Sequence, residues 1–158
     1  MSEEPPDPTR VVVDADVLAV DLLVGGEARE ALDLLRAHSW LTMVLSEQLV
    51  SDAASVIEAH TDDRLAGDWQ DRIMQDATIV VPTVSGHPAI AAAATGNAAS
   101  VLSFHKGLRS TAAGQTIRQH VATSVKSPDA FCKQLDPERL YEAISDEPYP
   151  GPDADPGA

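Results

Sequence analysis

The sequence predicts an α/β fold: a three-layer α/β/α sandwich around a central, mostly parallel sheet of about five strands. Short β-rich runs alternate with longer helical patterns along the chain. This alternation is typical of parallel strands with helices on both faces of the sheet. The first run, residues 11–13, consists of three valines, which is typical of a strand buried on both faces.

Two short helices are expected after this first strand. The apolar segment 17–24 can be capped by Asp14 or Asp16, and the glycine pair that follows it ends the helix. The next segment, 27–37, carries its apolar residues at helical spacing along one face.

The middle of the chain predicts two more strands and two more helices. A strand at 41–45 is followed by a helix that Ser46 can cap. A more polar helix is expected at 62–75, and a third strand at 78–81 ends at Pro82.

The last third of the chain predicts the remaining elements. An alanine-rich helix at 89–95 precedes a fourth strand at 101–104 and a fifth strand at 121–125. Two final helices are expected at 130–135 and 137–144, with prolines at their first-turn positions.

The chain has 158 residues, a length that suits one domain. We expect that domain at 10–144, between an N-terminal tail at 1–9 and a C-terminal tail at 145–158. Both tails are rich in proline and acidic residues. They bury too little apolar surface to offset the entropy lost on ordering, so we expect them to be disordered.

The composition is strongly acidic, with 25 Asp and Glu against 11 Lys and Arg and a formal net charge of −14. A large phosphate-binding surface is therefore not expected, because such surfaces place cations against phosphates. Few lysines among many acids also suggest a halophilic host, where molar salt shortens the Debye length to about 3 Å and screens self-repulsion. An ordinary acidic cytosolic protein is the alternative.

The single cysteine, Cys132, excludes an internal disulfide and a cysteine-based zinc site, which favours a reducing compartment. No apolar run approaches the roughly 18 residues of a membrane span. Residues 1–8 lack the basic start and apolar segment of a signal peptide. We therefore expect a cytoplasmic protein with no membrane partner.

Reactive side chains follow several of the predicted strands. Asp14 and Asp16 follow the first strand and His105 the fourth, while Asp52 lies in the helix after the second. Ligands of an open parallel sheet bind beyond the carboxyl ends of its strands. Carboxylates that converge there need a cation, and oxygen ligands without thiolates favour Mg²⁺ or Mn²⁺.

Each of these residues also has a structural interpretation. Asp16 is the expected cap of the helix that follows, although the Asp14 side chain can also cap it. The Asp52 side chain can be solvated on a helix face, and His105 can bond to backbone at the strand end. Ser103 can touch a phosphate or be buried and hydrogen-bonded. The other histidines have no ligand spacing and are expected to have no chemical role: His38, His60, His87 and His120.

Four segments occur in an order that matches a known family. They are Val-Val-Val-Asp14-Ala-Asp16-Val-Leu, Ser46-Glu-Gln-Leu-Val-Ser-Asp52, the Ala-rich helix and strand at 86–105, and Val-Lys-Ser-Pro-Asp129-Ala-Phe. Together they resemble the PIN domain, a family of mostly metal-dependent ribonucleases. The resemblance spans residues 11 to about 135.

The resemblance implies a metal-dependent endoribonuclease that hydrolyses RNA phosphodiesters. Asp14 and Asp52 would be the catalytic, metal-binding acids, Asp16 and His105 would complete or tune the metal site, and Ser103 would position the substrate. The cofactor would be Mg²⁺ or Mn²⁺. The family often forms homodimers, and many members have small inhibitory partners, but no segment here identifies an antitoxin-like partner.

The chain departs from the family pattern at two acids. Gly86 or His87 stands at the third acidic position and His105 at the fourth, while Asp16 stands where Asn is usual. A ligating His105 would favour Mn²⁺ or another transition metal. The loss of two acids leaves a second hypothesis open, a catalytically inactive PIN-like binding module.

A third hypothesis is a sheet that resembles phosphoaspartyl receivers. Lys126 follows the last predicted strand, as receivers require. Their acidic pair, however, precedes the phosphoacceptor by a full βαβ unit, and the order of Asp14, Asp16 and Asp52 does not fit that spacing.

Overall fold

The computed structural model describes residues 6–108 and 123–154 and confirms the α/β fold. Its centre is one sheet of five strands in the order β3-β2-β1-β4-β5, in which every neighbouring pair is parallel. The strands are β1 (Asp7–Val13), β2 (Thr42–Ser46), β3 (Thr78–Val80), β4 (Ala98–Leu102) and β5 (Ser124–Lys126).

The strand order places β1 at the centre of the sheet. The chain proceeds from β1 to β2 and β3 on one side, and then crosses to β4 and β5 on the other. The strand order therefore reverses between β1 and β4, and a crevice forms beyond the carboxyl ends of two such strands. Val12 marks the register there, pairing with Val44 of β2 and Val101 of β4.

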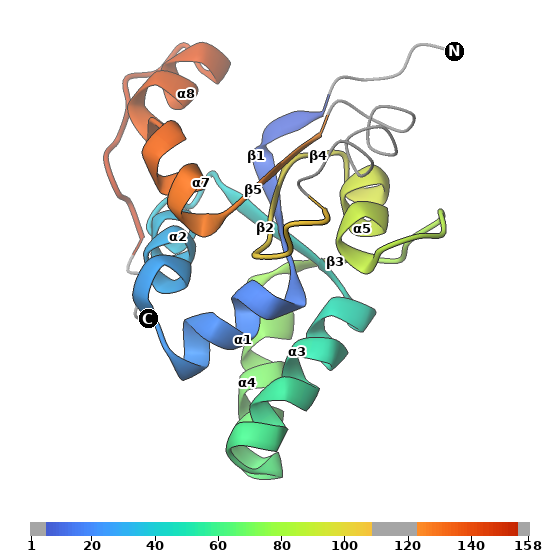
Figure 1. Cartoon of the computed structure of the whole chain (residues 1–158). Helices are drawn as coiled ribbons and strands as arrows, with labels where there is room; N and C mark the ends of the chain where they lie inside the picture. The colour runs from blue at the N-terminus through green and yellow to red at the C-terminus, as the bar shows by residue number, and fades with distance from the viewer. Residues whose placement is uncertain (1–5, 109–122, 155–158) are drawn as a thin grey trace.

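Helices cover both faces of the sheet, which gives the three layers (Figure 1). Helix α5 contacts β1, β2 and β4 on one side, whereas α2 and α7 pack together on the other. The helices α1, α3 and α4 pack in sequence near the carboxyl ends of the strands. The helix bounds are α1 (Ala15–Leu23), α2 (Gly26–Arg36), α3 (Glu47–His60), α4 (Asp63–Asp76), α5 (Pro88–Gly96), α7 (Pro128–Gln134) and α8 (Pro137–Ile144).

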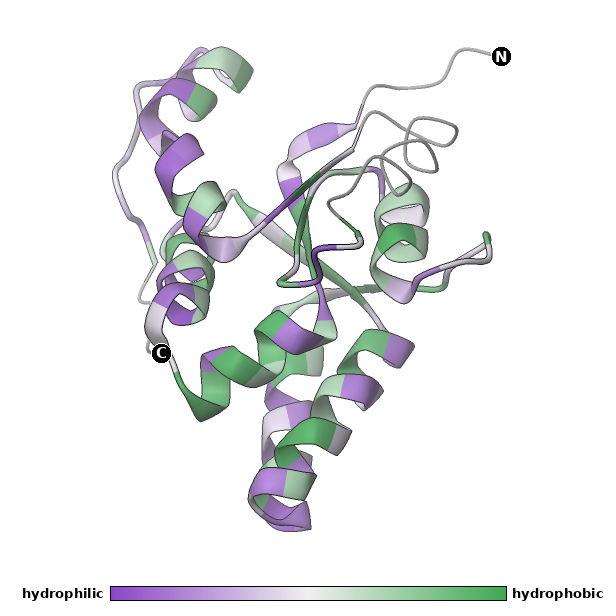
Figure 2. Ribbon diagram, in the orientation of Figure 1, coloured by the Kyte–Doolittle hydropathy of each residue, from purple (hydrophilic) through white to green (hydrophobic). Residues whose placement is uncertain are grey.

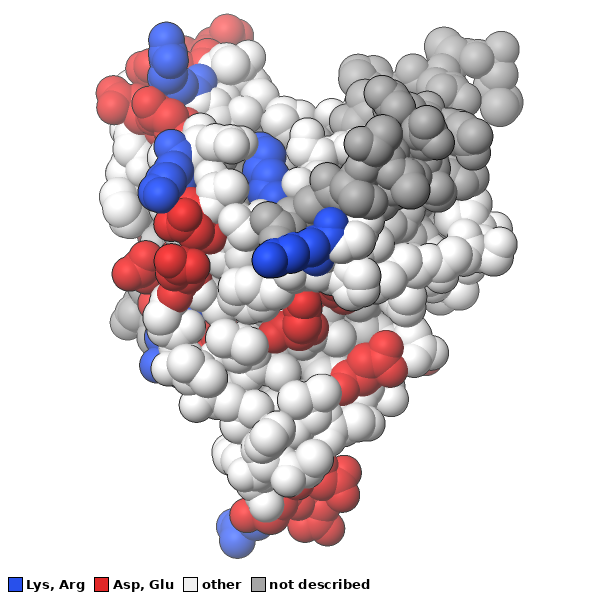
Figure 3. Space-filling view, viewed as in Figure 1, with Lys and Arg blue, Asp and Glu red and all other residues white. Residues whose placement is uncertain are grey.

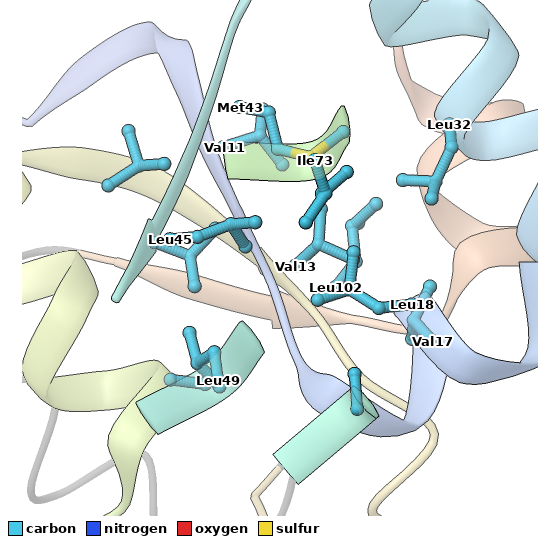
Figure 4. Close-up of a cluster of buried hydrophobic side chains, with 14 of the residues drawn as sticks. Val11, Val13, Val17, Leu18, Leu32, Met43, Leu45, Leu49, Ile73 and Leu102 are labelled. Atoms are coloured by element: carbon cyan, nitrogen blue, oxygen red, sulfur yellow. The ribbon is translucent and has the colours of Figure 1, made fainter. Parts of the chain in front are cut away.

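The core is aliphatic and lies between the sheet and its helices. Valines of β1 meet Leu102 of β4 and the first turns of α1, as Figure 4 shows. In Figure 2 hydrophobic residues concentrate on the strands, α1 and α5. Burial of these side chains contributes about 25 cal/mol per Å² of apolar surface. The central position of β1 therefore holds the residues that follow it in a firmly packed frame.

Helix α5 approaches the sheet closely because it ends in glycine. A Cβ atom at Gly96 would lie 2.7 Å from Cγ1 of Val44, closer than real contacts allow. The helix stops at Asn97, whose left-handed backbone (φ 55°) suits asparagine. Strand β4 can therefore begin at Ala98, three residues before the predicted start at Val101.

The structure corrects the predicted tail boundaries. Strand β1 begins at Asp7, so residues 7–9 belong to the sheet and not to a disordered tail. The segment 145–154 is irregular, but it is anchored to the loop between α2 and β2. The hydroxyl of Tyr149 lies 2.6 Å from Nε2 of His38, and Asp153 accepts hydrogen bonds from the backbone and hydroxyl of Ser39 at 2.7 and 2.6 Å.

The fifth strand is shorter than predicted, spanning Ser124–Lys126, while residues 121–122 of the predicted strand lie outside the described part. The strand order also decides against the receiver-like hypothesis. Receiver-type sheets have the order 2-1-3-4-5, whereas this sheet has 3-2-1-4-5.

Candidate active site at the carboxyl ends of β1 and β4

Asp14 is held rigidly at the end of β1. Its side chain is 6 % exposed, and its backbone N–H donates to the carbonyl of Leu102 in β4 at 2.9 Å. Oδ1 accepts from the N–H of Ala15 at 2.8 Å, so Asp14 caps α1. The capping role therefore belongs to Asp14, and the expectation that Asp16 is the cap is wrong.

Ser103 connects Asp14 to the loop after β4. This fully buried hydroxyl donates to Oδ2 of Asp14 at 2.7 Å and accepts from the N–H of His105 at 3.0 Å. A hydroxyl can do both at once. Ser103 thus fixes the Asp14 carboxylate and the backbone of His105 in one network.

Asp16 lies in the first turn of α1, beside Asp14. Its Oδ2 accepts from the N–H of Phe104 at 3.1 Å, which joins α1 to the same loop. Its Oδ1 is buried and has no hydrogen-bond partner among the described residues. An unpaired buried carboxylate oxygen costs free energy. Its position beside a second carboxylate therefore indicates a site where a ligand supplies the missing partner.

Burial raises the pKa of Asp16, and the charge of Asp14 raises that pKa further. The backbone N–H groups of Val17 and Phe104, and then the charge of His105, oppose the increase. Keeping the Asp16 carboxylate ionised therefore costs free energy, unless a cation binds to it; otherwise a proton neutralises it.

Two histidines border these carboxylates. His87 caps α5, because its Nδ1 accepts from the N–H of Ala89 at 3.1 Å, and its Nε2 lies 3.8 Å from Oδ2 of Asp14. His105 follows β4, and its Nδ1 accepts from the N–H of Leu108 at 3.3 Å. The ring centroids of His87 and His105 are 6.2 Å apart.

The structure thus brings together four of the predicted site residues and adds His87 to them. The four are Asp14, Asp16, Ser103 and His105. No chemical role was expected for His87, because its spacing to other ligands is irregular. A signal did exist, since Gly86 or His87 stands at the third acidic position of the PIN-like pattern. His120, in contrast, lies outside the described residues.

Asp52 is not part of this cluster. It is exposed on α3, and its Oδ1 accepts a hydrogen bond from Nε2 of Gln48 at 2.7 Å, one helical turn earlier. Over residues 6–108 and 123–154, no three His, Cys, Asp or Glu side chains are arranged as a ready metal site.

Two carboxylates nevertheless fit a hard divalent cation. Mg²⁺ usually keeps several waters and is bound through one or two protein carboxylates plus substrate phosphates. The unpaired Oδ1 of Asp16 and the neighbouring Asp14 carboxylate supply that ligand set. His105 fits ligation less well, because its Nδ1 accepts a backbone N–H and so the neutral ring carries its proton on Nε2.

A cleft of about 590 Å³ lies elsewhere, lined by parts of α1, α2 and α4 and by the start of β2. Several of its charged groups pair with one another, including Asp21 with Arg36 at 2.8 Å and Asp33 with Arg36 at 3.3 Å. These pairs indicate a structural role for that region. On the face drawn in Figure 3, basic side chains stand singly and form no continuous patch among the described residues.

The fold and the site define an α/β protein whose polar cluster lies at the carboxyl ends of β1 and β4, where the strand order of a parallel sheet reverses. The chain belongs to a family of unknown function, DUF7384, whose model matches residues 5–157. No curated protein matches the sequence. Within the described residues, no helix has the length and apolar character needed to cross a membrane.

Proposed function

We propose that this protein is a metal-dependent hydrolase of RNA phosphodiesters, with its active site at Asp14 and Asp16. The buried, unpaired Oδ1 of Asp16 beside the Asp14 carboxylate carries this proposal. The PIN-like pattern of the sequence supports RNA as the substrate. The single cysteine supports action in the reducing cytoplasm.

Each residue of the proposed site has a separate role. Asp14 and Asp16 would hold Mg²⁺ or Mn²⁺, and the bound ion would activate water for attack on phosphorus. Ser103 orients the Asp14 carboxylate through its 2.7 Å hydrogen bond. Water is excluded from the inner side of the site, because Ser103 and the valines of β1 are buried.

The test is cleavage of single-stranded RNA with added Mn²⁺ in molar KCl, comparing the wild type with D14N. We expect D14N to lose about 100-fold or more of the activity, because even residues that only support metal ligands are worth 10–100-fold. Asparagine still caps a helix well, so the variant should remain folded, which circular dichroism would show. Equal cleavage by both proteins would contradict the proposal.

Two further variants sharpen this test. D68N alters an exposed carboxylate of α4 and controls for the loss of one charge. D52N decides whether Asp52, which the PIN-like pattern includes among the catalytic acids, joins the site when the ion and RNA are present. A loss in D52N similar to that in D14N would mean that α3 rearranges around the substrate.

The second candidate function is a PIN-like module that binds without catalysis. The exposed position of Asp52, bonded to Gln48, favours it, because only two carboxylates then remain at the sheet edge. Under this hypothesis the wild type and D14N would both bind RNA and neither would cleave it.

A further inference from the structure

His87 and His105 bring two imidazole rings to the same side of the site from segments far apart in the sequence. His87 stands at the start of α5, and His105 stands in the loop after β4. Their ring centroids are 6.2 Å apart with an angle of 67° between the planes. The loop closes tightly around His105, since a Cβ atom at Gly107 would lie 2.7 Å from its ring.

The hydrogen bonds fix where each ring carries its proton. Both Nδ1 atoms accept a backbone N–H, from Ala89 in one case and Leu108 in the other. A neutral imidazole that accepts at Nδ1 must carry its proton at Nε2. Each ring, accepting at Nδ1, therefore presents an N–H donor at Nε2.

Neither Nε2–H has a hydrogen-bond acceptor among the described residues. For His87, Oδ2 of Asp14 lies 3.8 Å from Nε2, too far for a hydrogen bond. That oxygen already accepts from Ser103. Two donors thus remain free beside two carboxylates, one of which has an unpaired oxygen.

We propose that the Nε2–H groups of His87 and His105 together bind one phosphate group of the RNA substrate. This inference rests on the proposed function and extends it from the metal side of the site to the substrate side. With their centroids 6.2 Å apart, the two rings are close enough for one phosphate group to contact both, and hydrogen bonds to a charged acceptor are stronger than neutral ones. The carboxylates face a cation, and the imidazoles face an anion.

This division explains why the two histidines stand where the PIN-like pattern has acids. A site with four carboxylates must gather enough cations to offset their repulsion before an anionic substrate can approach. Replacing two carboxylates by N–H donors lowers that repulsion and gives the phosphate two direct contacts. In a chain of net charge −14, such local donors matter more than a diffuse basic surface.

The test uses H87N and H105N in the full chain. The Oδ1 of asparagine can accept the same backbone N–H that Nδ1 accepts, and asparagine is a good helix cap, so each variant removes the Nε2–H and keeps the local fold. H60N is the matched control. His60 is exposed at the far end of α3, about 20 Å along the helix from the sheet edge.

The first measurement is binding of a short single-stranded RNA in EDTA at constant ionic strength, followed by fluorescence anisotropy. We expect about a tenfold weaker Kd for each site variant, because a hydrogen bond to a charged group is worth roughly that factor. H60N should bind like the wild type. Unchanged affinity in both H87N and H105N would overturn the inference.

A second measurement does not depend on the variants folding. Inorganic phosphate is titrated into the wild type in EDTA while the histidine ring C–H signals are followed by NMR. We expect the signals of His87 and His105 to shift and that of His60 to remain in place. Shifts of all three would show a general charge effect, and no shift at the first two would show no phosphate site; either result overturns the inference.

The two proposals can fail separately. Mn²⁺ binding by the wild type and by D14N, measured by electron paramagnetic resonance without RNA, reports on the carboxylates alone. If Mn²⁺ does not bind but the histidine variants lose RNA affinity, the metal mechanism fails and the phosphate-binding pair stands. If Mn²⁺ binds and the variants bind RNA normally, the reverse holds.

Discussion

Helix α1 carries two poorly exposed aspartates whose surroundings differ sharply. Asp21 is 5 % exposed and pairs with the Arg36 guanidinium at 2.8 and 3.4 Å, with Arg29 at 3.8 Å beside it. Asp16 lies five residues earlier, and its Oδ1 has no partner among the described residues. The same residue type on one helix is thus compensated in one place and left uncompensated in the other.

The histidines of these two regions differ in the same way. His38, near Asp21, donates from Nδ1 to the carbonyl of Leu34 at 2.9 Å and meets the Tyr149 hydroxyl at Nε2. Both of its ring nitrogens are therefore satisfied within the protein. His87 and His105, near Asp16, each satisfy only Nδ1.

The comparison teaches that burial of a charged or polar group does not by itself indicate a function. Around Asp21 the charged groups pair with one another and His38 bonds through both ring nitrogens, although Nε1 of the neighbouring Trp40 has no partner among the described residues. At the sheet edge the buried Oδ1 of Asp16 has no partner among the described residues, a cost in stability that a protein tolerates where a ligand later supplies the partner. His87 is half-buried and His105 is exposed, so water reaches their rings. The wider cleft of about 590 Å³ belongs to the first kind of region.

The largest expected effect comes from R36M, which breaks the ion pair between Asp21 and Arg36. Asp21 would then be a buried carboxylate with Arg29 as its remaining cation, and we expect a loss of about 3 kcal/mol in the free energy of unfolding. Urea denaturation measures it. The double variant D21N/R36M should recover part of the loss, and equal stability of R36M and the wild type would show that the pair contributes nothing.

A smaller effect is expected from Y149F, which removes the hydroxyl that faces Nε2 of His38. One buried nitrogen of His38 then loses its partner, which costs about 1 kcal/mol. The C-terminal segment should also become easier to cleave in limited proteolysis, since Tyr149 and Asp153 anchor it. Resistance equal to the wild type would mean that Asp153 alone holds the segment.

The smallest effect, and one of opposite sign, is expected from D16N in the absence of divalent ions. Burial and the charge of Asp14 raise the pKa of Asp16 in the folded state. The folded state therefore holds this proton more tightly than the unfolded state, and stability falls as the pH rises from the unfolded pKa through the raised folded pKa. Above that window D16N should be slightly more stable than the wild type.

This prediction is checked by urea denaturation of both proteins across the acidic and neutral range. Added Mn²⁺ should reverse the order, because it stabilises the wild type and has a weaker site in D16N. If D16N is less stable than the wild type throughout, without metal, then Asp16 belongs with Asp21 as a structural residue.

Much of the fold could be predicted from the sequence because it depends on local patterns. The valine run of β1, the cap Ser46 and the proline starts of α7 and α8 all act within a few residues. The errors fell at boundaries set by distant partners. Asp7 pairs with Ala98 of β4, which draws residues 7–9 into the strand, and no local pattern encodes that contact.

The candidate site was predicted in part. Asp14, Asp16, Ser103 and His105 follow β1 and β4 directly, so their meeting needed only a parallel sheet. His87 was missed because it reaches the site through α5, whose angle across the sheet depends on the close packing at Gly96. The direction of the Asp52 side chain could not be predicted either. Periodicity alone does not fix how α3 is rotated about its axis, and so does not say whether Asp52 faces the carboxyl edge of the sheet.

The amino-acid sequence by itself determined the alternation of strands and helices, the helix caps and the kinds of reactive groups at each strand end, because these follow from short-range sterics and hydrogen bonding. The tertiary structure alone decided which groups remain unsatisfied. Asp16 and Asp21 look alike along the chain, and only the packing of α2 brings Arg36 to one of them. The distinction between a stabilising charge and a candidate ligand-binding charge is therefore made by long-range contacts.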